Sequence, residues 1–178
     1  NWEERQSFQP APNNGQAGVS VAVGSTYAVA GAPTVDTDAG ASAGVAYLVE
    51  LTSPSFWEES GRVDAGNSTN FDDFGIAVAI DDDSPSTSWV AVGAPGVDAQ
   101  VRNQGKLAIF RRNGLSYTFA GSVLNTSSPI DPTDPSFGRA LDVEASDPRI
   151  VVGESRWDRT VIARGTLAPD VGRAHVFR

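Results

Sequence analysis

Residues 74–80 read FGIAVAI, and they are followed by WVAVGAP at residues 89–95 and GKLAIF at residues 105–110. Each run is short, alternates small residues with Val, Ile or Leu, and is bounded by turn-forming residues. This pattern is typical of β-strands, and no window has the apolar spacing of a helix. The central part of the chain therefore predicts three consecutive strands.

The same three landmarks occur, in the same order, before and after this stretch. The middle glycines, Gly31, Gly93 and Gly153, stand 62 and 60 residues apart. Regular spacing of this kind is the signature of a repeat architecture. The matching runs are GVSVAV at 18–23, YAVAGAP at 27–33, GVAYLV at 44–49, FGRALDV at 137–143, RIVVGE at 149–154 and GRAHVF at 172–177.

A fourth landmark, a stretch led by Trp, Phe or Tyr, precedes each first glycine, at residues 2–8, 56–63 and 117–124. We interpret these stretches as outer strands, where a sheet has room for large side chains, and the small-residue runs as crowded inner strands. The fold class we expect is all-β. It comprises three blades of four antiparallel strands, forming one continuous segment of a β-propeller. The repeats are assigned to residues 1–50, 51–112 and 113–178.

The combined motif resembles the FG-GAP repeat, which builds the propeller of integrin α-subunits. The second copy carries the full pattern, with Phe74-Gly75, Gly93-Ala94-Pro95 and Gly105. The first copy has Ala17-Gly18 in place of Phe-Gly, and the third has Gly153-Glu154-Ser155 in place of Gly-Ala-Pro. The resemblance covers essentially the whole chain and implies a propeller fold with an adhesive, ligand-binding or scaffolding role.

Composition excludes several classes of function. The formal net charge is −9 over 178 residues, which argues against nucleic-acid binding because phosphate contacts require a basic surface. No apolar run approaches the roughly 18 residues of a membrane span, so we expect no membrane insertion. The chain has no Cys and a single His. We expect that residue, His175, to be a strand residue, and nothing resembles a catalytic nucleophile elbow. The sequence therefore predicts a protein that is not an enzyme.

Acidic residues provide two candidate metal sites. In many FG-GAP repeats, calcium is bound by acids at alternate positions after the first strand, which points to Asp81 and Asp83 here. The later positions of this loop lack carboxylates, so too few oxygens are present for the six to eight that Ca²⁺ prefers, and a solvated acidic turn is the competing interpretation. Asp36 and Asp38 form a second pair.

A further Asp recurs five residues after each middle glycine, as Asp36, Asp98 and Asp158. A short acidic side chain at a loop commonly accepts hydrogen bonds from nearby backbone N–H groups. We expect this structural role, with a low-affinity cation site as the alternative.

Two N-glycosylation sequons begin at Asn67 and Asn125, both in the segment between an outer strand and the next inner strand. Such sites are expected in exposed loops of secreted proteins. The sequons support an extracellular or cell-surface location and a glycoprotein only in a eukaryotic secretory context.

Three blades are fewer than the four to eight of closed propellers. The chain also opens with an outer-type strand at residues 2–8 and closes with a third-type strand, so one strand is available to donate and one edge to receive it. We predict a structural or adhesive extracellular scaffold that assembles with other chains, as a two-chain ring or a filament. The alternatives are a module that binds a glycan or protein ligand, with Ca²⁺ as a possible cofactor, and a non-catalytic propeller part of a larger secreted protein.

Overall fold

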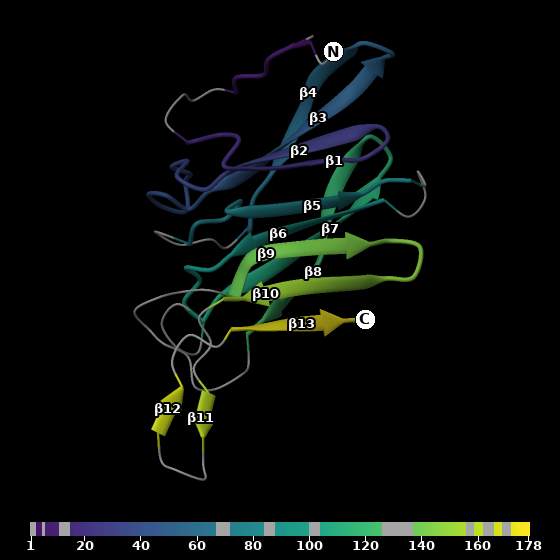
Figure 1. Cartoon of the computed structure of the whole chain (residues 1–178). Coiled ribbons are helices and arrows are strands. Elements are labelled where there is room, and N and C mark those ends of the chain that lie inside the picture. The colour runs from purple at the N-terminus through teal and green to yellow at the C-terminus, as the bar shows by residue number, and fades with distance from the viewer. Residues whose placement is uncertain are drawn as a thin grey trace.

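A computed structural model describes most of the chain and shows an all-β protein (Figure 1). The described residues contain no helix that is long and apolar enough to cross a membrane. They are residues 3–4, 6–10, 15–66, 72–83, 88–99, 104–125, 137–155, 159–161, 166–168 and 172–178.

The first and second sheets each contain four antiparallel strands in the order of the chain. Each sheet therefore consists of simple hairpins, as the repeat predicted. The strands of the first sheet are β1 (Ser20–Val23), β2 (Tyr27–Ala32), β3 (Val45–Ser53) and β4 (Phe56–Val63). Those of the second are β5 (Ala77–Asp81), β6 (Trp89–Ala94), β7 (Lys106–Asn113) and β8 (Ser116–Leu124).

The third sheet has three strands in its described part. It lacks the fourth strand assigned to a complete repeat, which agrees with the expectation that the chain closes with a third-type strand and leaves one edge open. It contains β9 (Phe137–Glu144), β10 (Arg149–Glu154) and β13 (Arg173–Phe177), with β10 in the middle. Between β10 and β13 the chain forms an additional small hairpin, β11 (Arg159–Val161) and β12 (Thr166–Ala168), which the sequence did not predict.

The predicted outer strand at residues 2–8 is also wrong, because residues 3–4 and 6–8 form no strand. Gln6 binds the segment to β4, and the Phe8 ring packs edge-on against Tyr47 of β3. The Gln6 amide donates from Nε2 to the Trp57 carbonyl at 2.6 Å, and its Oε1 accepts the Trp57 N–H at 2.9 Å. A strand requires a neighbouring backbone ladder, and here a single glutamine amide occupies the edge instead. The other outer stretches form β4 and β8, so hydrogen bonding assigns each outer strand to the sheet before it.

Glycine conformation explains how each sheet begins. Gly18, Gly75 and Gly138 have φ angles of 93°, 97° and 89°, a region that residues with a Cβ rarely occupy. Backbone conformation therefore accounts for the glycine near the start of each first strand. The second strands end at Ala32 and Ala94, each directly followed by the proline of the Gly-Ala-Pro motif, because proline has no N–H to continue a ladder.

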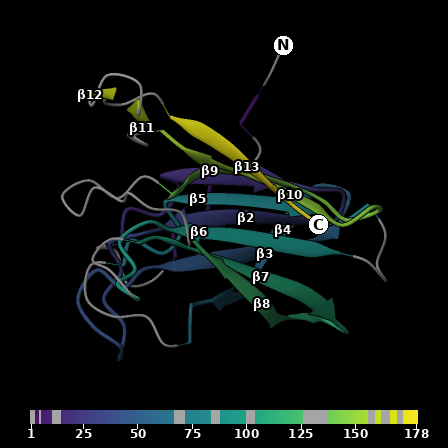
Figure 2. The ribbon, with the colours of Figure 1, turned by 90° about the horizontal axis from the view of Figure 1, so that it is seen from below.

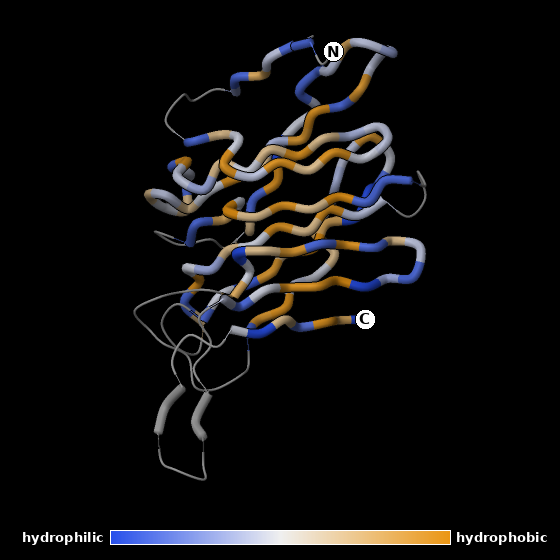
Figure 3. The backbone as a smooth tube through the Cα atoms, viewed as in Figure 1, coloured by the Kyte–Doolittle hydropathy of each residue, from blue (hydrophilic) through white to orange (hydrophobic). Residues whose placement is uncertain are grey.

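Successive sheets lie face to face, in the order of the chain (Figures 1 and 2). β5 contacts both β1 and β9, so the first strands of the three sheets form a continuous row. Between the first two sheets, Tyr27 and Val29 pack in one apolar cluster with Val90 and Phe110. Between the second and third sheets, Leu107, Phe137 and Val152 share another. Figure 3 shows apolar residues along the strands and hydrophilic residues at many of the turns.

Candidate functional site

A polar junction lies where the first and second strands of each sheet are connected. These three connections are the β1–β2 turn, the β5–β6 loop and the β9–β10 turn, and they follow one another along one end of the strands (Figure 1). The β5–β6 loop is in the middle and begins with the acidic run that the sequence singled out. Its first two carboxylates contact the turns on either side.

Asp82 holds the turn of the preceding sheet. Its side chain is buried, and its Oδ2 accepts the backbone N–H groups of Thr26 and Tyr27, both at 2.8 Å. Its Oδ1 accepts the N–H of Ser25, while the Ser25 hydroxyl donates to the Asp82 carbonyl at 3.0 Å. One carboxylate thus satisfies three consecutive N–H groups, and hydrogen bonds to an ionised acceptor are stronger than neutral ones.

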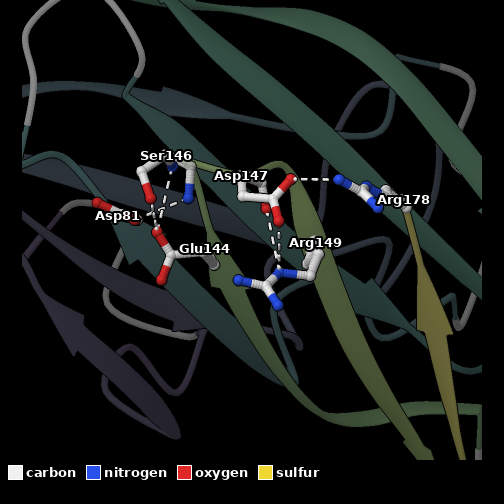
Figure 4. A network of polar contacts seen from close by, with 7 residues as sticks. Asp81, Glu144, Ser146, Asp147, Arg149 and Arg178 are labelled. Carbon is white, nitrogen blue, oxygen red and sulfur yellow. Dashed lines mark hydrogen bonds and ion pairs between the residues drawn. The ribbon is translucent and has the colours of Figure 1, made fainter.

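Asp81 holds the turn of the following sheet. Its Oδ2 accepts the N–H of Ala145 at 2.7 Å, and its Oδ1 accepts the N–H of Asp83 at 3.2 Å. Figure 4 shows Asp81 beside Glu144 and Ser146 of this turn. The third turn is further ordered by its own side chains, because Glu144 accepts the Ser146 N–H at 3.2 Å. Adjacent residues of one loop therefore tie together all three sheets.

These contacts account for the predicted calcium residues. Both oxygens of Asp81 already accept backbone N–H groups, and Asp83 is exposed at the loop surface. In the part of the chain that the structure describes, no three acidic or histidine side chains are grouped closely enough to hold a metal ion. The geometry favours the interpretation of the acidic run as a set of structural caps.

The second acidic pair is partly explained in the same way. Asp36 is exposed and accepts the N–H of Ser42 at 2.9 Å, so the predicted capping of a loop by this residue is confirmed. Asp38 and Asp98 lie exposed on loops of the first and second sheets. Asp158 lies outside the described residues.

Aromatic side chains pack next to the turn that Asp82 caps. Tyr27 packs edge-on against Tyr117, with ring centroids 5.4 Å apart, and the Arg112 guanidinium lies 4.7 Å from the centre of the Tyr27 ring. The Tyr117 hydroxyl shares a short hydrogen bond with Ser88. Burial raises the pKa of Tyr117 to about 12 and also raises the pKa of Tyr27. Both phenols therefore stay protonated at neutral pH and act as packing groups.

A second polar cluster surrounds Glu154, which replaces the alanine of the Gly-Ala-Pro motif. This carboxylate is 4% exposed. Its Oε2 lies 2.6 Å from Arg173 Nε and 3.0 Å from His175 Nε2, and its Oε1 accepts the Asn125 amide at 2.7 Å. A buried carboxylate needs such partners, because desolvation of an unpaired charge costs several kcal/mol.

The cluster settles the position of His175, which is a strand residue as predicted. It pairs with Val152 and stacks on Phe177 at an interplanar angle of 7°. By strand register it corresponds to Tyr47 in the first sheet and Ala108 in the second.

The structure describes only one of the two predicted glycosylation sites. Asn67 lies outside the described residues. Asn125 is 2% exposed, and its Nδ2, the atom that would carry a glycan, donates to Glu154. The expectation of an exposed Asn125 is wrong, because this side chain completes the hydrogen bonding of a buried carboxylate.

A glycine joint links each sheet to the next. A Cβ added to Gly31 would overlap the carbonyl oxygen of Gly75, and one added to Gly93 would overlap that of Gly138. The middle glycine of one sheet thus lies directly against the first glycine of the following sheet. Backbones approach this closely only where neither residue has a side chain.

Two glycines of this repeated contact, Gly153 and Gly18, have no partner glycine against them among the described residues. A Cβ on Gly153 would meet only Ala140, at 3.4 Å for the nearest atom. A Cβ on Gly18 would meet no atom within 4 Å. The middle glycine of the last sheet and the first glycine of the first sheet are therefore the two open ends of one repeated contact.

Two residues with structural roles were not identified from the sequence, Asp82 and Glu154. The available signal for Glu154 was its departure from the Gly-Ala-Pro motif, together with a basic residue at the start of the third strand of the same copy. For Asp82 no signal distinguished it from its acidic neighbours, because its partners come from another repeat.

No protein-family model matches this chain, and no curated protein matches it.

Proposed function

We propose that this chain is a non-enzymatic structural module of FG-GAP type, an extracellular scaffold segment whose sheets continue into those of other chains. The observation that carries the proposal is the pair of open glycine joints, Gly153 at one end of the stack and Gly18 at the other. Because each internal junction joins equivalent glycines, the third sheet of one copy is built to receive the first sheet of another. Contact between two different surfaces gives a ring or a filament.

The outward face of the first sheet supports this proposal. Val21 and Val23 are 72% and 71% exposed. By strand register they correspond to Val78 and Ile80, which pack against the first sheet inside the molecule. Apolar residues at positions that are buried in the next copy of the repeat indicate a face suited to the same packing.

The opposite face, on the third sheet, shows the complementary pattern. Val151 and Val176 are 43% and 69% exposed. They correspond by register to Ala91 and Ile109, which belong to the apolar cluster between the second and third sheets. Each end of the stack therefore presents one half of an internal interface.

The test uses Gly153→Ala and light scattering over a range of concentrations. Wild-type protein is expected to associate, and the added methyl group would overlap the Gly18 carbonyl of a second copy. We expect loss of association with the free energy of unfolding unchanged within about 0.5 kcal/mol, because the described residues of a single chain leave room for a Cβ there. Val21→Asp at the other end should have the same effect.

Gly121→Ala is the matched control, since a Cβ at Gly121 meets no atom within 4 Å. This variant should associate like the wild type. A wild-type protein that stays monomeric at every concentration contradicts the proposal. Association that neither Gly153→Ala nor Val21→Asp reduces would place the contact on another surface.

A further inference from the structure

The outer edge of β13 is the third open feature of the stack. In the first two sheets the third strand is paired on both sides, with β4 and β8 as the outer strands. In the third sheet, β13 is paired only with β10 in the described structure. An edge strand with unpaired backbone groups is a template for an added strand.

The chain contains a second copy of an outer-strand sequence that forms no strand. Residues 2–8 read WEERQSF, and residues 57–63, within β4, read WEESGRV. The described part of the first segment, residues 3–4 and 6–8, lies beyond the first sheet, at the opposite end of the stack from β13 (Figure 1). The segment at residues 2–8 therefore does not lie next to β13 of the same chain.

The same segment borders the face that the proposed stacking requires and encloses one side of it, although Val21 and Val23 stay largely exposed. Gln6, Ser7 and Phe8 form one wall of a mainly apolar cavity of about 370 Å³, whose other wall includes Val21 and Val23. A second copy can fill this cavity and pack fully against the first sheet only if the segment moves away. Two exposed hydrogen bonds between Gln6 and Trp57 and an edge-on contact of the Phe8 ring with Tyr47 hold the segment in place, and exposed hydrogen bonds contribute little.

We propose that residues 2–8 of one copy add to the β13 edge of a second copy as its fourth strand. This inference rests on the proposed scaffold function and names its partner as another molecule of the same chain. Inside the molecule, the stretch before each sheet is the outer strand of the preceding sheet. The exchange extends that rule across two chains, and it uncovers the first sheet in the same movement.

The register follows from the first sheet. There β3 pairs with β4 through Val49 opposite Glu59 and Glu50 opposite Glu58. The corresponding residues of the third sheet are Phe177 and Arg178, so Glu4 is placed opposite Phe177 and Glu3 opposite Arg178. The like-charged pair of the first sheet becomes an attractive pair between two chains, since opposite charges across a strand pair are favourable.

Cysteine cross-linking tests this register, because the chain has no native Cys. Glu3→Cys and Arg178→Cys alter exposed residues and are purified separately, mixed and oxidised mildly. Register-paired thiols have a high effective concentration, so we expect roughly tenfold more mixed disulfide than from the control mixture. The control pairs Arg178→Cys with Glu58→Cys, an exposed glutamate in the equivalent position of β4.

Hydrogen exchange of the wild-type protein provides a second measurement. Amides of β13 should become protected as protein concentration rises, because their free edge gains a ladder. If wild-type protein associates but shows neither β13 protection nor a mixed disulfide above the control, strand donation is wrong and stacking survives. If wild-type and variant proteins remain monomeric at every concentration, both strand donation and the scaffold proposal are wrong.

Discussion

Gly24 and Asp82 meet across the junction between the first two sheets, where the Asp82 carboxylate occupies the space that a Cβ of residue 24 would require. The carboxylate is held there by the N–H groups of the residues that follow Gly24. The close approach of a turn and a neighbouring side chain therefore depends on the absence of one methyl group.

Replacement of Gly24 by Ala is expected to lower the free energy of unfolding by about 1–3 kcal/mol, as other overpacked sites do. Urea denaturation measures this change, with Gly121→Ala as a control at an open position. In a double-mutant cycle, Asp82→Ala should remove most of the Gly24→Ala penalty, because the clashing oxygen is then gone. Equal penalties with and without the Asp82 carboxylate would show that the overlap is not the cause.

Asp82→Ala alone should also be strongly destabilising. It leaves the N–H groups of Ser25, Thr26 and Tyr27 without their acceptor, and Tyr27 is fully buried. We expect a loss of about 3 kcal/mol, since unsatisfied buried donors cost about 1–3 kcal/mol each. Asp83→Ala, at an exposed carboxylate of the same loop, should change stability by less than about 0.5 kcal/mol. Similar losses for both variants would contradict a specific capping role.

Removal of the Glu154 carboxylate should lower the free energy of unfolding, and two further substitutions should restore it. Glu154→Ala leaves Arg173 and His175 without their shared carboxylate and should cost about 3 kcal/mol, as expected when one partner of a buried pair is removed. Adding Arg173→Val and His175→Tyr reproduces the side chains of the first sheet at these positions. Thermal and urea unfolding should show that the triple variant regains most of the lost stability. A triple variant that is less stable than Glu154→Ala would exclude this explanation.

Asp73 predicts a pH dependence. Burial raises the pKa of Asp73 above its usual 3.8, the neighbouring Asp72 adds to the rise, and Arg139 opposes it. A carboxyl with a raised pKa in the folded state contributes stability below its unfolded pKa. That stability is lost as pH rises through the folded pKa. Asn has no such charge and tolerates the φ of 55° at this position.

Asp73→Asn should therefore gain stability relative to wild type as pH rises from about 4 to 7. The gain should stay below about 1 kcal/mol, because the carboxylate is only half-buried. Unfolding curves across this pH range measure the difference, and Asp38→Asn, at an exposed loop, serves as the control. A difference that shrinks as pH rises would contradict the assigned direction.

Calcium provides a prediction for the acidic loop. Because Asp81 and Asp82 already accept backbone N–H groups, millimolar Ca²⁺ should shift the melting temperature by less than about 1 °C relative to a chelator, since stabilisation by a ligand requires binding to the folded state. Calorimetric titration provides an independent check. Measurable heat together with a rise of several degrees would restore the metal-assisted alternative, and Mg²⁺ would test its selectivity.

The strands themselves could be predicted from the sequence because their signals are local. Alternating residues in a run such as 74–80 identify a strand, whatever the rest of the chain contains. In the same way, the proline after Gly93-Ala94 marks where a strand ends. The stretch at 2–8 carries the same local signal but forms no strand in its described part. A strand also requires a free edge beside it, and local pattern does not report whether one is available.

Site residues were harder to predict, because their roles depend on neighbouring sheets. Asp82 follows β5 of the second sheet but accepts backbone N–H groups from the first sheet. Asn125 follows β8 of the second sheet, and its buried side chain donates to the Glu154 carboxylate of the third sheet. Sequence motifs identified Asp81 and Asn125 by their residue type and spacing. Contacts across the junctions decide what these side chains do, and they arise only once the sheets are stacked.

The caps contributed by Asp81 and Asp82 come from one loop of the middle repeat, yet they serve the repeats on both sides. Melting of that single loop would release the turns of all three repeats together, so the array should behave as one cooperative folding unit rather than as modules that open one by one. In repeat proteins, cooperativity is set by coupling between nearest neighbours. Here that coupling is concentrated in two adjacent carboxylates, which makes the centre of the chain, more than either terminus, the point from which the whole array would come apart.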